Sequence, residues 1–230
     1  MNDETTAIRE RYARRAAIPA DRYSVFSPDV LLRAHAFERA LVAMLKQGGV
    51  LAPQEKSVLE IGCGEGINLL QLIRLGFDPA RMAGNDLRDE SLVAARRILP
   101  QAVRLLPGEA SALAFGSETF DIVTQSTVFS SILDDTMQTA VAARMWALTR
   151  PGGAVLWYDL AVDNPWNKDV RGLPLERIRA LFPNGTITAR RITLAPPLAR
   201  IAAAIHSSIY RALDTLPFLR SHLLCWIAKG

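Results

Sequence analysis

The stretch Val58-Leu59-Glu60-Ile61-Gly62-Cys63-Gly64-Glu65-Gly66 decides the fold of this chain. A short apolar segment runs directly into three alternating glycines, and an apolar-periodic segment follows them up to Leu75. This order predicts a β-strand, a tight turn and an α-helix, with the backbone of the turn open to a ligand. Because a helix N-terminus presents free N–H groups, such a turn favours a polar or anionic ligand.

A second signal is Asp86, which ends the next predicted strand. In nucleotide-binding α/β folds, an acidic residue about 20 residues beyond the glycine turn holds the ribose hydroxyls. The glycines here are spaced GxGxG, and Ile67 stands where a dinucleotide fingerprint has its third glycine. The carboxylate of Glu60 disfavours a phosphate at the turn and suits a ligand with hydroxyls or a cationic group, as S-adenosylmethionine has.

The sequence resembles the class I S-adenosylmethionine-dependent methyltransferases, whose first motif is similar to residues 58–66. Asp86 matches their ribose-binding acid, and Pro107-Gly108-Glu109-Ala110 resembles the segment whose acid meets the adenine amino group. Phe120-Asp121-Ile122-Val123-Thr124-Gln125 resembles their fourth strand, and residues 146–156 resemble the helix, Pro-Gly-Gly turn and fifth strand that follow. The flanks, residues 1–50 and 160–230, resemble bacterial methyltransferases associated with polysaccharide or glycolipid assembly.

This resemblance implies S-adenosyl-L-methionine as the cofactor and methyl transfer to a small-molecule or glycan- or lipid-linked acceptor by in-line displacement. Much of the rate acceleration in such a displacement comes from alignment and desolvation. We expect nine residues to bind the cofactor: Glu60, Gly62, Cys63, Gly64, Asp86, Leu87, Glu109, Ala110 and Gln125.

The alternation of strand and helix patterns predicts an α/β protein with a Rossmann-like, doubly wound, mostly parallel sheet. Strands are expected at residues 57–61, 81–86, 103–106, 120–125, 154–159, 186–194 and 219–228. Helices are expected from Pro28 to Gly48 and at residues 66–75, 89–98, 135–148, 174–181 and 198–213. The resemblance implies that the last of the seven strands is antiparallel. We expect one domain over residues 1–230, with an N-terminal helical lid (1–50), a cofactor-binding core (51–160) and substrate-side elements (161–230).

Composition limits the protein class. The chain has 230 residues, of which 50% are hydrophobic, enough for one full core. No apolar run approaches the roughly 18 residues that a membrane span needs, and the N-terminus lacks the pattern of a signal peptide. Two cysteines make no disulfide framework. We therefore expect a cytoplasmic protein, without a metal site because no Cys/His cluster has ligand spacing, and without a recognisable nucleic-acid module.

The basic charge is concentrated near the C-terminus. Residues 189–230 contain six Lys or Arg and one Asp, although the whole chain carries a net charge of only +4. Apolar residues alternate with these charges. The segment could therefore contact an anionic membrane surface or an acidic substrate, or it could be an amphipathic helix and a strand whose arginines simply meet water.

A substrate is expected beyond the carboxyl ends of the strands, where open α/β sheets bind ligands. Candidate substrate-binding residues are Tyr12, Tyr23, Phe129, Tyr158, Asn164, Asn167 and Arg171. Among them, Arg171 suits an anionic group because its planar fork pairs bidentately with carboxylate or phosphate, whereas Asn164 and Asn167 could simply form a turn. A hydroxyl acceptor would also need a base, for which Asp159 and His35 are candidates. The acceptor atom itself could be oxygen, nitrogen or carbon.

Two other functions fit parts of the pattern. A glycine turn also occurs in nicotinamide-dependent oxidoreductases, although Glu60 and Ile67 argue against a pyrophosphate there. A scaffold that binds S-adenosylmethionine without catalysis, as a subunit of a membrane-associated assembly, would show the same glycine turn and Asp86.

Overall fold

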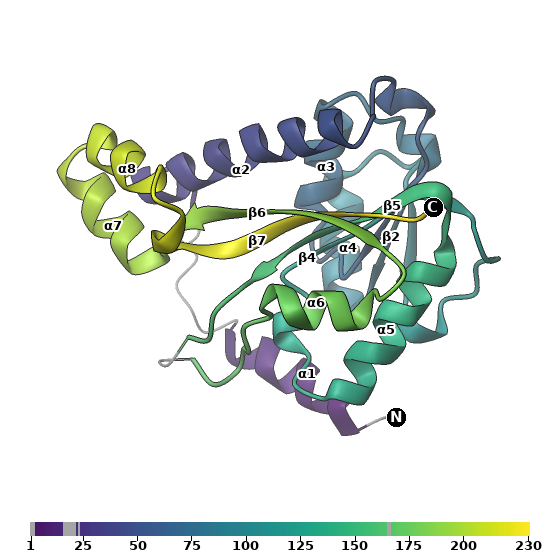
Figure 1. The fold of residues 1–230 in the computed structure, drawn as a ribbon. Coiled ribbons are helices and arrows are strands. Elements are labelled where there is room, and N and C mark those ends of the chain that lie inside the picture. Colours follow the sequence, from purple (N-terminus) through teal and green to yellow (C-terminus); the bar gives the residue numbers. More distant parts are fainter. Residues whose placement is uncertain (1–2, 16–21, 23, 165–166) are drawn as a thin grey trace.

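The computed structural model describes residues 3–15, 22, 24–164 and 167–230 and contains one seven-stranded sheet (Figure 1). The strand order is β3-β2-β1-β4-β5-β7-β6. Neighbouring strands from β3 to β5 pair in parallel, and β7 is antiparallel to both β5 and β6. The expected Rossmann-like sheet with an antiparallel last strand is confirmed. The strands are β1 Val58–Ile61, β2 Met82–Asp86, β3 Arg104–Pro107, β4 Phe120–Ser126, β5 Thr149–Leu160, β6 Thr186–Leu194 and β7 Arg220–Ala228.

Helices cover both faces of the sheet (Figure 1). Helices α2, α3 and α4 pack on one face, and α1, α5 and α6 pack on the other. Helices α7 and α8 form a hairpin in the connection from β6 to β7, at one end of the molecule. The helices are α1 Asp3–Arg15, α2 Pro28–Gln47, α3 Ile67–Arg74, α4 Asp89–Ile98, α5 Asp135–Leu148, α6 Leu175–Leu181, α7 Pro196–Ile205 and α8 Ser207–Asp214.

Local sequence chemistry explains where several helices begin and end. Pro28 starts α2, where its fixed φ angle and missing N–H cost nothing, and Gly48 follows its last turn. Asp134 caps α5 by accepting a hydrogen bond from the backbone N–H of Met137 at 2.6 Å. None of the described helices combines the length and apolar character that crossing a membrane requires.

Strand β1 divides its side chains between the two cores. Leu59 and Ile61 belong to the core under α1, α5 and α6, whereas Val58 belongs to the core under α2, α3 and α4. This alternation is the period of two of a β-strand. Glu60 therefore lies on the same face as Val58, which decides the environment of its carboxylate.

Two predicted elements differ in extent. The helix expected over residues 198–213 is two helices, because His206 is extended (φ −168°, ψ 143°) and its Nδ1 accepts the N–H of Ser208 to cap α8. Strand β5 begins at Thr149, before the Pro-Gly-Gly turn residues instead of after them. Gly152 within it has φ +73° and donates its N–H to the carbonyl of Lys229 at 2.8 Å.

Candidate functional site

The three glycines of the turn after β1 each meet a different steric demand. Gly62, Gly64 and Gly66 have φ angles of 64°, 53° and 84°, which side-chain-bearing residues rarely adopt. A Cβ on Gly66 would lie 2.7 Å from Leu99, and one on Gly62 would lie 2.4 Å from Val128. A Cβ on Gly64 would meet no atom within 4 Å. The turn is thus closed by packing at its two ends and open at its middle.

Asp86 ties the end of β2 to this turn. Its Oδ2 accepts the backbone N–H of Gly64 at 2.8 Å, and its Oδ1 accepts the N–H of Arg88 at 2.9 Å. A carboxylate has about four lone-pair positions, so both oxygens can accept further hydrogen bonds. Cys63 lies buried beneath the turn against Gly84, and burial raises the pKa of its thiol.

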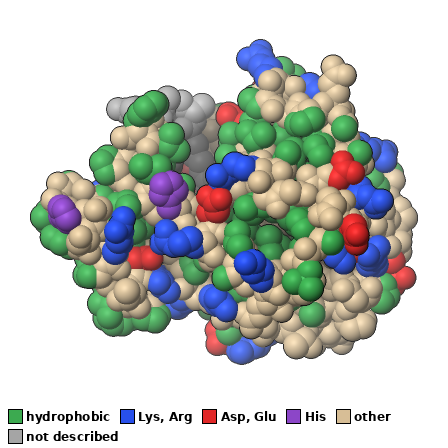
Figure 2. Space-filling model, turned by 90° about the horizontal axis from the view of Figure 1, so that it is seen from above, with side chains coloured by type: hydrophobic (Ala, Val, Ile, Leu, Met, Phe, Trp, Pro, Cys, Tyr) green, Lys and Arg blue, Asp and Glu red, His purple; other side chains and the backbone are tan. Residues whose placement is uncertain are grey.

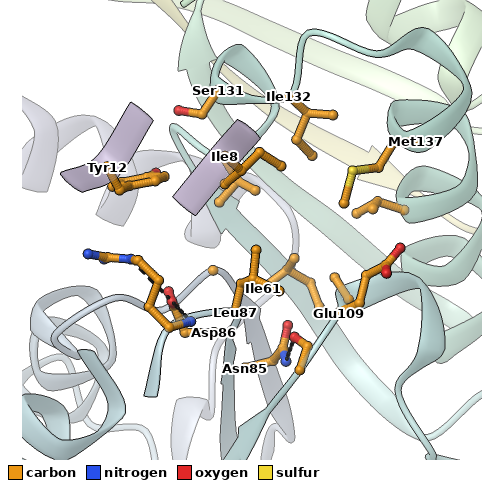
Figure 3. A pocket seen from close by; sticks show the side chains of 16 residues that line it. Ile8, Tyr12, Ile61, Asn85, Asp86, Leu87, Glu109, Ser131, Ile132 and Met137 are labelled. Carbon is orange, nitrogen blue, oxygen red and sulfur yellow. Dashed lines mark hydrogen bonds and ion pairs between the residues drawn. The ribbon is translucent and has the colours of Figure 1, made fainter. Parts of the chain in front are cut away.

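A cavity of about 590 Å³ of empty space opens beyond the ends of β1, β2 and β3 (Figure 3). Five of the residues expected to bind the cofactor line it: Gly62, Asp86, Leu87, Glu109 and Ala110. Figure 3 shows Asp86 and Glu109 on opposite sides of the cavity, with Ile61 and Leu87 between them. An apolar slot with a carboxylate at each side has the chemistry to hold a nucleoside, with ribose hydroxyls and an exocyclic amino group as donors.

Several residues around this cavity were not predicted from the sequence. Asn85 is one of them: its side-chain amide donates to the carbonyls of Leu106 at 3.1 Å and Gly108 at 2.9 Å. It thereby fixes the loop that carries Glu109. A polar residue buried next to Asp86 at a strand end was the signal that could have identified it.

Helix α1 forms the roof of the first cavity and contributes Ile8 and Tyr12 to its lining (Figure 3). Arg9 donates from Nη2 to the carbonyl of Leu87 at 2.6 Å. The guanidinium of Arg88 stacks over the Tyr12 ring, 4.4 Å from its centroid. Helix α1 is thus attached to the loop after β2. The predicted contact of Tyr12 with substrate is untested, and Tyr23 lies outside the described residues.

Helix α1 is also attached to the loops after β4 and β5. Glu4 accepts the N–H of Leu133 at 2.8 Å and pairs with Arg11, which donates to the carbonyl of Ser131 at 3.1 Å. Arg14 pairs at 2.7 Å with Asp169, which follows β5. Residues expected to be a lid therefore form a helix held at the cavity by partners distant in sequence.

A second cavity of about 340 Å³ lies on the opposite face of the sheet, between β1, β4 and β5 and helices α2 and α3. Glu60, Gln125 and Tyr158 line it, together with apolar side chains such as Phe37 and Leu224. Glu60 and Gln125 were expected to bind the cofactor, and here they lie across the sheet from Glu109. Both cavities adjoin the point between β1 and β4 where the strand order reverses, the usual ligand site of such sheets.

Glu60 is completely buried and incompletely paired. Its Oε1 accepts the Asn68 side-chain amide at 2.8 Å, and its Oε2 has no hydrogen-bond partner among the described residues. Burial raises the pKa of this carboxyl to about 8, and the negative charge of Asp86 adds to the increase. A buried carboxylate oxygen without a partner is costly, so this position suits a cationic donor supplied by a ligand.

The loop after β4 separates the two cavities. Gln125 accepts the N–H of Val128 at 3.0 Å and donates to the carbonyl of Tyr158 at 3.3 Å. Thr127 has φ +56°, a strained angle for a β-branched residue, and donates its N–H to the same carbonyl at 2.8 Å. Gln125 therefore holds Val128 against Gly62.

Asp159 is buried and lines neither cavity. Its two oxygens accept the N–H groups of Ser130 at 3.1 Å and Leu160 at 2.8 Å, and burial raises its pKa to about 6. Phe129 is also in the core, with its ring centroid 4.5 Å from that of Trp157. The structure thus places both residues in support of the loop and brings neither to a cavity.

The other substrate and base candidates also lie apart from the two cavities. His35 is exposed on α2. Asn167 donates its N–H to the carbonyl of Asn164 at 3.0 Å and accepts the N–H of Asp169 at 3.0 Å, which is a turn stabilised by its own side chain. Arg171 forms an ion pair with Asp135 at the start of α5. Their proposed contacts with substrate remain predictions.

Comparison with known proteins agrees with the geometry. The family model of the methyltransferase domain matches residues 58–153. A search of curated proteins found no match. Similar solved structures are an S-adenosylmethionine-dependent methyltransferase from Mesorhizobium loti (15% identity, TM-score 0.59, 82% of this chain and 96% of that one) and a SAM-dependent methyltransferase from Archaeoglobus fulgidus (12%, TM-score 0.58, 83% and 94%).

At such low identity the solved structures establish the fold alone, and the family model covers residues 58–153. Its match begins at β1 and extends through the glycine turn, Asp86, Glu109 and β4 into the Pro-Gly-Gly turn. The cofactor expected for this domain is S-adenosylmethionine, and the two carboxylates that line the first cavity and the unpaired Glu60 oxygen fit it. Residues 58–153 therefore match the methyltransferase domain, within a fold that this chain shares with solved S-adenosylmethionine-dependent methyltransferases.

Proposed function

We propose that this enzyme methylates a small-molecule acceptor, or the small end of a glycan- or lipid-linked acceptor, at the second cavity. The observation that carries the proposal is the position of that cavity at the reversal point between β1 and β4. The cavity is bordered by strands and by helices α2 and α3, and its empty space of about 340 Å³ includes open solvent. Such a space admits one small group and is too small for a folded macromolecule.

The two cavities would divide the work of binding. Asp86 and Glu109 would hold the nucleoside part of the cofactor in the first cavity, and Glu60 would pair with its ammonium group at the second. S-adenosylmethionine supplies a methyl group that its sulfonium activates for in-line transfer to a nucleophile. The residues between the cavities, Gly62 and Val128, would then set the path along which donor and acceptor align.

The acceptor end of the second cavity would lie at Phe37 and Tyr158, whose ring centroids are 4.6 Å apart. The Tyr158 hydroxyl forms a 2.8 Å hydrogen bond with Thr193, and burial raises its pKa to about 12. Tyr158 is therefore a poor base near neutral pH and a good hydrogen-bond donor. Since no other titratable residue besides Glu60 lines this cavity among the described residues, we propose an acceptor that is nucleophilic without a protein base.

The test is an acceptor search with purified enzyme. The protein is incubated with S-adenosylmethionine and separated fractions of a bacterial extract: polar metabolites, extracted lipids, protein and nucleic acid. Mass spectrometry then identifies compounds that gain one methyl group, with the Asp86→Asn variant as the control for cofactor-dependent signal. We expect a methylated compound in the metabolite or lipid fraction.

Two results would contradict the proposal. Methylation confined to the protein or nucleic-acid fraction would show that the acceptor is a macromolecule. Tight binding of S-adenosylhomocysteine without turnover in any fraction would favour the non-catalytic scaffold instead.

A further inference from the structure

The helical hairpin between β6 and β7 has an apolar surface that the rest of the described chain leaves exposed. Helix α7 buries Ala199 and Ala202 in a small core with Leu32 of α2. On another side of the same helix, Ile201 and Ile205 are 63% and 66% exposed. A spacing of four residues places these two isoleucines on one stripe of the helix.

Other exposed apolar side chains lie on the same hairpin and on the segment that follows it. Leu198 precedes the two isoleucines, Ile209 lies on α8, and Leu216 and Phe218 follow α8, with Phe218 75% exposed. We call these side chains the hairpin patch: Leu198, Ile201, Ile205, Ile209, Leu216 and Phe218. Large apolar side chains gathered on one projecting element typically mark a binding surface.

A basic groove lies beside the hairpin. It contains about 810 Å³ of empty space and is lined by Arg39 of α2, Arg190 and Arg191 of β6, and Arg220 of β7. Among the described residues that line this groove, Asp214 is the one acid, and it pairs with Arg220 at 3.5 Å. We call this feature the arginine groove, and its lining has a clear excess of positive charge.

Part of the hydrogen-bonding capacity of the groove is used internally. Arg190 donates to the Gln47 side chain at 2.6 Å, and Arg191 and Arg220 each donate to the other's backbone carbonyl, at 3.2 and 2.9 Å. Each guanidinium has five N–H donors, so further donors remain for an anion. Figure 2, which views the molecule from above, shows Lys and Arg side chains beside hydrophobic ones at the end formed by the hairpin.

We propose that the hairpin patch and the arginine groove dock this enzyme on an anionic phospholipid surface. Apolar side chains enter the interface of a bilayer, and guanidinium groups bind lipid phosphates, so the two features fit one partner. A free phosphate would leave the apolar patch unexplained. A second copy of the chain would bring the same positive charge against itself.

The location of this surface relates it to the acceptor. Strands β5 and β6 are both antiparallel to β7, so they run in the same direction, and the hairpin starts at the carboxyl end of β6. The loops that border both cavities leave the same edge of the sheet. Docking would turn the acceptor entrance toward the lipid and favour an acceptor carried by a lipid. This inference about the acceptor rests on the proposed function.

The docking itself is tested without measuring activity. Full-length protein is sedimented with vesicles of phosphatidylcholine, alone or mixed with phosphatidylglycerol. We expect binding to the mixed vesicles, weakened by salt because exposed charges are screened. The triple variant Ile201→Ser, Ile205→Ser, Phe218→Ser and the double variant Arg190→Gln, Arg191→Gln should each lose at least about tenfold in vesicle affinity.

Matched controls lie on α4. Val93 is an exposed apolar residue and Arg97 an exposed arginine, so Val93→Ser and Arg97→Gln test whether any apolar or basic surface would suffice. Both should bind like the wild type. Circular dichroism and S-adenosylhomocysteine affinity, unchanged in all variants, would show that the fold is intact.

Three results would overturn the docking proposal: wild-type protein that ignores the anionic vesicles, hairpin and groove variants that bind as tightly as the wild type, or a dimer that the triple variant breaks without any vesicle binding. If vesicle binding holds but no lipid fraction is methylated, the docking surface stands and the lipid-linked acceptor fails. The two proposals therefore fail separately.

Discussion

The substitution Glu60→Gln tests the electrostatic design of the cofactor site. Glu60 is fully buried, one of its oxygens is bound by Asn68, and the other has no partner among the described residues. Glutamine keeps the size of the side chain and the hydrogen bond from Asn68 but cannot ionise. The substitution therefore removes the ability of this side chain to ionise and little else.

The effect on stability follows from the pKa of this carboxyl. Its value rises from 4.5 to about 8 on folding, mainly through burial. The fold favours the protonated form of this carboxyl. The contribution of the carboxyl to the stability of the folded state is therefore complete below pH 4.5 and is lost as pH rises through about 8. At about 1.4 kcal/mol per pH unit, the wild type should lose about 2 to 3 kcal/mol relative to Glu60→Gln between pH 5 and pH 7.

The effect on ligand binding has the opposite sign. An ammonium group next to Glu60 would favour the carboxylate, so S-adenosylhomocysteine should displace a proton when it binds below pH 8. Glu60→Gln should weaken its binding at least about tenfold, since a hydrogen bond to a charged group contributes about 1.5–3 kcal/mol. The wild-type affinity should rise with pH up to about 8, and the variant should lack this rise.

Two measurements check these expectations. Thermal unfolding from pH 5 to pH 9 gives the stability difference, and isothermal titration in two buffers of different ionisation enthalpy counts the released protons. Glu65→Gln, an exposed carboxylate in the same turn, is the matched control. Binding without proton release, together with equal affinity of Glu60→Gln and the wild type at every pH, would refute the pairing of Glu60 with the ammonium group.

Three further predictions concern the first cavity. Asp86→Ala should weaken the binding of S-adenosylhomocysteine, measured by titration calorimetry, at least tenfold, which is about 1.4 kcal/mol. Asp78→Ala, outside the site, should leave this affinity unchanged. Equal affinities of Asp86→Ala and the wild type would show that Asp86 does not bind the ribose. Gly62→Ala should lower the free energy of unfolding by about 2 kcal/mol or more in chemical denaturation, because of the positive φ of Gly62 and the contact of a new Cβ with Val128. The double variant Gly62→Ala, Val128→Ala should recover part of this loss. No recovery would mean that backbone strain alone is responsible. Arg9→Ala should speed both hydrogen exchange in α1 and ligand dissociation. Unchanged exchange would show that the hydrogen bond from Arg9 to Leu87 does not hold α1 over the cavity.

The sequence predicted those parts of the site that short-range rules determine. Strand, glycine turn and helix follow from adjacent residues, and the three positive φ angles explain why glycine occurs at 62, 64 and 66. Asp86 was identified because its distance along the chain from the turn reflects one strand-helix-strand unit. Its hydrogen bond to Gly64 shows how close that unit brings the two.

Strand alternation was the first point at which prediction became incomplete. Glu60 and Gly62 were both expected to bind the cofactor because they belong to one motif, residues 58–66. In the structure they border different cavities, since the Glu60 side chain lies on the face under α2 and α3. Applying the period of two to β1 would have separated them.

Contacts between distant segments were the second such point. Arg9 meets Leu87, Glu4 meets Leu133, and Arg171 meets Asp135, pairs that no local pattern connects. Arg171 was a candidate for binding an anion because arginine suits that role. In the structure Arg171 pairs with the carboxylate of Asp135, which only the tertiary structure places beside it, and its contact with a substrate stays a prediction.

The hairpin shows the limit of periodicity most clearly. An apolar pattern over residues 198–213 predicts a helix, but it cannot identify the partner that covers each side. Ala199 and Ala202 are small and meet α2 closely, whereas the larger Ile201 and Ile205 meet no covering element in the described chain. Small residues permit close helix packing. Bulky exposed apolar residues are removed from water only when another molecule covers them. Because arginines adjoin these exposed apolar side chains, the partner that we propose for the hairpin is an anionic bilayer, which would contact both the apolar and the charged groups.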